Sequence, residues 1–143
     1  GLGDVYKRQI LDVLLREEIH NCIVVVTRYF GGTLLGTGGL VRAYQAATQA
    51  GLAASSIIEK QFGKKLHLTT DYTGIGKLQY LIAQNQVFTL DTRYTDSVTI
   101  DLMVPEEKFA DFYAQVTEAT SGQAQMDSED LEEFGIVNGE IIF

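Results

Sequence analysis

The stretch that decides the fold is residues 65–126, which read KLHLTTDYTGIGKLQYLIAQNQVFTLDTRYTDSVTIDLMVPEEKFADFYAQVTEATSGQAQM. Alternating apolar side chains and a short final run predict four strands, at 65–70, 87–94, 97–104 and 123–126. Apolar residues at helical spacing predict two helices, at 75–84 and 105–120. The resulting order, strand, helix, strand, strand, helix, strand, is typical of the ferredoxin-like βαββαβ fold.

Downstream of this unit the chain becomes acidic. Residues 127–133 hold five carboxylates, so we expect this segment to fray or to form an exposed helix. Residues 136–143 are expected to form a short hairpin around Asn138–Gly139, a dipeptide that favours the tight hairpin turn. We therefore treat 127–143 as an acidic tail.

Upstream, the pattern changes at Gly63. Residues 10–18 predict a short helix, and the β-branched run 23–27 predicts a strand buried on both faces. A glycine-rich loop from Gly31 to Gly39 leads into an alanine-rich helix at about 40–54. Together with the downstream unit, these elements predict an α+β protein of two parts.

Composition narrows the class of protein. Apolar residues make up 45% of the 143 residues and charged residues 21%, which is enough for a packed core. The one cysteine, Cys22, excludes an intramolecular disulfide. The sequence shows no apolar run long enough to cross a membrane and no signal peptide, so we expect a cytoplasmic protein.

Charge is unevenly distributed. Residues 1–65 carry eight basic and five acidic side chains, whereas residues 66–143 carry three basic and fourteen acidic ones. An acidic surface repels a phosphate backbone, so any nucleic-acid contact is expected in the first 65 residues.

The segment most indicative of function is RYFGGTLLGTGGLVRAY, residues 28–44, which holds five glycines within nine positions. Such a loop between a strand and a helix exposes backbone amides, and the helix dipole favours an anion there. Arg28 and Arg42 flank it. We predict a binding surface formed by Arg28, Tyr29, Gly31, Gly32, Gly36, Thr37, Gly38, Gly39 and Arg42.

Known phosphate motifs do not fit this loop. Gly31 and Gly36 have P-loop spacing, but Thr37 and Gly38 stand where lysine and serine or threonine are required. Val41 replaces the third glycine of the dinucleotide fingerprint. A loop that only turns the chain and lets the helix pack remains an alternative.

Other residues give no catalytic or metal pattern. His20, Cys22 and His67 are too scattered for metal-ligand spacing, and Ser55 and Ser56 lack the context of a nucleophile elbow. We predict no catalytic residue, no metal ligand and no cofactor.

Residues 24–48, VVVTRYFGGTLLGTGGLVRAYQAAT, closely resemble the signature of the IMPACT/YigZ family. Residues 66–82, with Asp71 and Tyr72, and residues 93–105 resemble that family's C-terminal domain. The resemblance covers about residues 10–126, in the bacterial two-domain arrangement.

The resemblance implies an N-terminal domain, of which 10–62 is the C-terminal part, similar in fold to elongation factor G domain IV. It also implies a ferredoxin-like domain at 63–126, similar to elongation factor G domain V. Family members carry further residues upstream, so we expect the chain to be a fragment. Residues 1–9, GLGDVYKRQ, resemble translated adapter sequence and are expected to be a leader foreign to the family.

The leading hypothesis is a non-catalytic cytoplasmic binding protein linked to translation regulation, which contacts RNA or the ribosome through the surface at 28–42. A second hypothesis is an enzyme that acts on a phosphorylated or anionic small molecule at the same loop. A third, implied by the eukaryotic relatives, is a regulator that binds a protein partner of the translation machinery.

Overall fold

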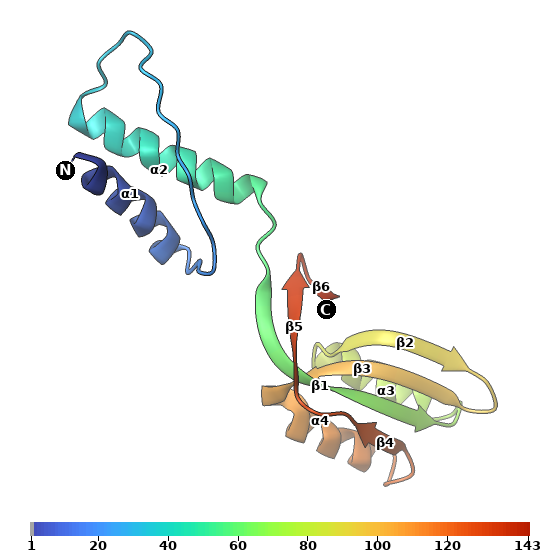
Figure 1. Ribbon diagram of the computed structural model, residues 1–143. Helices are drawn as coiled ribbons and strands as arrows, with labels where there is room; N and C mark the ends of the chain where they lie inside the picture. Colours follow the sequence, from blue (N-terminus) through green and yellow to red (C-terminus); the bar gives the residue numbers. More distant parts are fainter. Residues whose placement is uncertain (1) are drawn as a thin grey trace. The chain divides into compact units, whose positions relative to one another are not determined.

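The computed structural model describes residues 2–143, and their side chains from Val5 onward (Figure 1). It contains helices and strands in two compact units, which divide between Ile57 and Ile58. The α+β class is therefore confirmed. The division lies upstream of Gly63, the position at which the sequence pattern changes; Gly63 lies inside a long strand.

Unit 1 consists of two packed helices and the segment that joins them, and its helices are α1 (Leu2–Arg16) and α2 (Gly36–Ala54). The rings of Tyr6 and Tyr44 stack with centroids 4.7 Å apart, and Gln45 Nε2 donates to Gln9 Oε1 at 2.9 Å. Val13 is buried at the same helix pair. The helix predicted at 10–18 thus begins earlier, because its packed stripe continues back to Tyr6.

The strand predicted at 23–27 is absent, so this prediction was wrong. Residues 22–31 are extended without strand pairing, and Ile23 and Val25 are 92% and 82% exposed. Val24 and Val26 are half-buried, so exposure alternates along the segment. A β-branched run becomes a strand only when a neighbour pairs with its amides and carbonyls, and no described residue of the chain does so.

Unit 2 is a six-stranded antiparallel sheet with two helices. Its elements are β1 (Glu59–Thr70), α3 (Ile75–Gln84), β2 (Phe88–Tyr94), β3 (Val98–Pro105), α4 (Glu106–Ala119), β4 (Gln125–Ser128), β5 (Glu132–Val137) and β6 (Glu140–Ile142). Strand β1 is central: β3 pairs with it on one side, and β4 and β5 pair with it on the other. The strand order β2-β3-β1-β4 is that of a split βαββαβ unit, which confirms the predicted order of elements.

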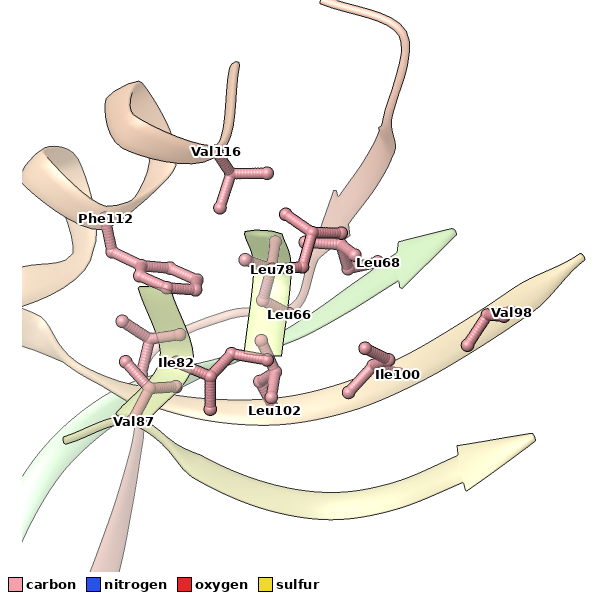
Figure 2. Close-up of a cluster of buried hydrophobic side chains, with 11 residues drawn as sticks. Leu66, Leu68, Leu78, Ile82, Val87, Val98, Ile100, Leu102, Phe112 and Val116 are labelled. Atoms are coloured by element: carbon pink, nitrogen blue, oxygen red, sulfur yellow. The ribbon is translucent and has the colours of Figure 1, made fainter. Parts of the chain in front are cut away.

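The main core lies between α3, α4 and one face of this sheet. Figure 2 shows Phe112 and Val116 of α4 directed toward the buried leucines of β1, Leu66 and Leu68. All four side chains are fully buried. Alternation along β1 then places the intervening His67 on the opposite face of the sheet.

The acidic tail is part of the sheet, which corrects our expectation of a frayed segment or an exposed helix at 127–133. Strand β4 extends to Ser128, and β5 begins at Glu132 and pairs with residues 59–63 of β1. The predicted terminal hairpin is confirmed, with Asn138 and Gly139 both at positive φ in its turn. Pairing with β1 gives the acidic residues a structure that their composition alone does not favour.

Strand β5 also closes a small apolar cluster on the face opposite the helices. Phe134 is buried and meets Phe88 edge-on, with ring centroids 5.8 Å apart. A Cβ atom on Gly63 would lie 2.8 Å from the ring of Phe134 and 2.6 Å from the carbonyl oxygen of Val104. Gly63 is therefore required where three strands meet closely.

Candidate functional site

The glycine-rich loop of unit 1 is shorter than the predicted loop from Gly31 to Gly39. Helix α2 begins at Gly36 rather than near residue 40, so Gly36, Gly38 and Gly39 belong to its first turn. The loop proper is 31–35. Arg42 consequently lies in the second turn of α2, which corrects its predicted place in the first turn.

Two glycines of the segment need their conformational freedom. Gly32 has φ +86° and Gly36 has φ +73°, the region that residues with a side chain rarely adopt. Gly38 and Gly39 lie within α2 and have no positive φ, so their backbone conformation does not require glycine. Gly39 instead provides space, since a Cβ atom there would lie 2.9 Å from Cβ of Leu35.

An open cavity of about 700 Å³ lies in unit 1 between α2 and the segment before it, residues 26–35. Five of the nine predicted site residues line it, namely Arg28, Tyr29, Gly31, Gly36 and Thr37. The other lining side chains are mostly apolar, among them Phe30, Leu40 and Tyr44. Gly32, Gly38, Gly39 and Arg42 do not line it, so the structure brings together only part of the predicted set.

Aromatic side chains at the start of the loop are strongly exposed. Tyr29 is 88% and Phe30 is 68% exposed, although both also line the cavity. Arg28, directly before them, is exposed as well. Tyr29 was among the predicted site residues, whereas Phe30 was not. The available signal was a second aromatic residue directly after Tyr29 and two positions after an arginine.

Arg42 lies against the first turn of α2. Its Nη1 atom would be 3.3 Å from a Cβ atom on Gly38, so the side chain reaches back toward the helix N-terminus. Arg42 is exposed, and among residues 5–143 neither Arg28 nor Arg42 forms an ion pair. The first turn of α2 contains no acidic residue, so its free amides and Arg42 give that end of the helix a positive potential.

Unit 2 contains a charged cluster that was not predicted from the sequence. His67 bonds to Asp101 through Nδ1 at 2.7 Å and to Glu129 through Nε2 at 2.9 Å. Arg93 donates to Asp101 at 2.7 Å and to Asp91 at 2.9 Å. These partners come from four segments, so only the strand register, which the sequence does not display, could have revealed the cluster.

The hydrogen bonds of this cluster shift the pKa values of its members. The carboxylates of Asp101 and Glu129 raise the pKa of His67. The Arg93 guanidinium, and then the His67 ring, hold the pKa of Asp101 below its usual value. Among the side chains that the structure describes, from Val5 onward, no three His, Cys, Asp or Glu are arranged to hold a metal ion.

The helices of the described chain lack the length and hydropathy that a membrane crossing requires.

Two models of known protein families match this chain, one in each unit. The family described as "Impact N-terminal domain" matches residues 6–52, and "Domain of unknown function (DUF1949)" matches residues 68–123. The chain belongs to the IMPACT family. The first match contains the whole predicted binding surface, and the second contains helices α3 and α4 and strands β2 and β3 of the ferredoxin-like unit.

Similar full-length proteins include IMPACT family member YvyE of Bacillus subtilis, 32% identical over 121 residues. IMPACT family member YigZ of Escherichia coli is 28% identical over 119 residues. The alignments cover 85% and 83% of this chain but only 56% and 58% of those proteins, so the chain spans little more than half their length.

A solved structure, titled "Crystal structure of an hypothetical protein", covers 86% of this chain at 26% identity. The chain covers 60% of that structure, with a TM-score of 0.49.

Proposed function

We propose that unit 1 binds single-stranded RNA through Arg28, Tyr29, Phe30 and Arg42, and that the protein acts without catalysis near the translation machinery of the cytoplasm. The observation that carries this proposal is the pair of strongly exposed aromatic rings directly after an exposed arginine. Aromatic faces on which bases stack, beside cations that attract the backbone, are the shared features of single-strand binding surfaces.

Charge supports placing RNA on unit 1. Residues 1–57 carry five basic and four acidic side chains, whereas residues 58–143 carry six basic and fifteen acidic ones. A polyphosphate chain is therefore repelled by unit 2 and tolerated by unit 1. Residues 28–42, which span the loop and the first two turns of α2 as far as Arg42, contain no acidic residue to oppose it.

Membership of the IMPACT family supports a role near translation through the similarity of fold that the resemblance implies. Under this proposal unit 1 corresponds to part of a domain similar to elongation factor G domain IV, and unit 2 to one similar to domain V. The bound RNA would then be ribosomal.

The test is a titration of a fluorescent single-stranded oligouridylate with this chain at several salt concentrations. We expect Arg28→Gln and Arg42→Gln each to weaken binding and to lower the slope of log affinity against log salt by about one, because each removes one phosphate contact. Tyr29→Ala and Phe30→Ala are expected to weaken binding by at least about fivefold through lost stacking.

Two matched variants serve as controls in unit 2. Lys77→Gln removes one exposed cation from α3, and Tyr80→Ala removes one aromatic ring that is 65% exposed on the same helix. Both are expected to bind as the unmodified chain does. If the variants of unit 1 and their controls bind RNA equally, the proposal is wrong and a protein partner for this surface becomes the better hypothesis.

A further inference from the structure

His67 occupies a position that requires two protons on its ring. Both ring nitrogens face carboxylate oxygens, Nδ1 toward Asp101 and Nε2 toward Glu129. Neither carboxylate has a proton to donate at neutral pH, so each bond needs an N–H from the imidazole. Neutral histidine has only one, which means that loss of a proton turns one of the two attractive contacts into a repulsion between lone pairs.

Asp101 and Glu129 differ in their hydrogen-bond partners other than His67. Asp101 also accepts two hydrogen bonds from Arg93, at 2.7 and 3.4 Å, and its side chain is 16% exposed. Glu129 is 53% exposed, and among the described side chains its carboxylate is bonded to His67 alone. A neutral ring therefore keeps its proton on Nδ1 for Asp101 and releases Glu129 into water.

Glu129 lies at a break in the strand pairing. Strands β4 and β5 both run along the same side of β1, and residues 129–131 connect them without strand structure. The amide of Glu129 donates to the carbonyl of Lys65 at 2.9 Å. Two hydrogen bonds therefore attach this connection to β1, one through the side chain of Glu129 and one through its main-chain amide.

We propose that His67 is a pH-sensitive latch, which holds the connection at 129–131 against β1 only while both ring nitrogens are protonated. Loss of one proton frees Glu129 and loosens its main-chain bond to Lys65, while β4 and β5 stay paired with β1.

Other charged groups face His67 from the strands on this side of the sheet. They are Lys65 on its own strand, Asp91 and Arg93 on β2, Asp101 on β3, Asp127 as its register partner on β4, and Glu129. Four of the six are acidic, so the surroundings favour the imidazolium. Helices α3 and α4 cover the other face of the sheet and place no charge against the ring.

The direction of the pH dependence follows from the raised pKa of His67. A group whose pKa is higher in the folded chain stabilises the fold at low pH, and that stabilisation is lost as pH rises through the raised value. The latch is therefore closed on the acidic side of the His67 titration and open on the alkaline side.

The experiment is a pH series on the whole chain by nuclear magnetic resonance, from about pH 6 to about pH 9, which brackets a histidine with a raised pKa. Ring resonances report the protonation of His67, and hydrogen exchange of the Glu129 amide, divided by its intrinsic rate, reports opening. We expect the normalised rate to rise by at least about fivefold across the His67 titration, a typical lower value for coupling between two sites.

Two variants make the result decisive. Glu129→Gln replaces the carboxylate by an amide that can donate to a neutral ring, so its normalised exchange is expected to stay flat with pH. His20→Gln removes the other, exposed histidine and is expected to behave as the unmodified chain. A constant rate in the unmodified chain while His67 titrates, or the same rise in Glu129→Gln, would overturn the proposal.

Discussion

Gly36 shows at the scale of one residue how the chain enters α2. Its φ of +73° disfavours any side chain, whereas Gly31 in the preceding loop has no positive φ, and neither has an atom within 4 Å of an added Cβ. We expect Gly36→Ala to lower the free energy of unfolding of unit 1 by about 1 kcal/mol. Gly31→Ala is the matched control. Urea unfolding followed by far-ultraviolet circular dichroism measures both, and equal midpoints would contradict the backbone conformation described for Gly36.

Gly63 lies where strands β1, β3 and β5 pack closely together, and a substitution there tests that packing. A methyl group there meets the backbone of β3 and the ring of Phe134 on β5, neither of which can move away freely. We expect Gly63→Ala to destabilise unit 2 by about 1–3 kcal/mol through overpacking. Gly76→Ala on α3, with open space around the added carbon, is expected to stabilise by up to about 1 kcal/mol through helix propensity. Thermal unfolding that ranks the two variants in the reverse order would refute this account of the β1–β3–β5 junction.

Elements were predictable from the sequence where the deciding signal is local. Helix α3 has the predicted bounds, and the hairpin of β2 and β3 lies within one residue of prediction, because alternation and helical spacing are read within a single segment.

Elements were mispredicted where the deciding partner is distant. Residues 23–27 have the composition of a strand but no described strand pairs with them. Residues 127–133 have the composition of an exposed acidic segment, yet both ends of it pair with β1. At the site, the arginines and the loop were predictable from residue types. The positive φ of Gly36, the early start of α2 and the bonds of His67 depend on geometry that single residues do not reveal.

Unit 2 is held together by six paired strands and by two helices packed on the sheet, whereas unit 1 has a single pair of packed helices. We therefore expect limited proteolysis to cut first in the extended segment at 22–35 and to leave a fragment that contains residues 58–143. Mass spectrometry identifies the surviving fragment. Preferential survival of residues 10–62 would show that unit 1 is the more stable of the two.

The central place of β1 has a consequence for the order in which unit 2 folds during synthesis. β1 is the first element of the unit to be made, yet Glu59 pairs with Ile136, 77 positions later. The pairs between β1 and β3 span fewer residues, so they can close first, and the edge that β5 covers stays unpaired until β5 itself has been made. During that interval residues 59–63 of β1 form an unpaired strand edge. Lysine on or beside such an edge discourages pairing with foreign strands, and β1 carries lysines at 60, 64 and 65.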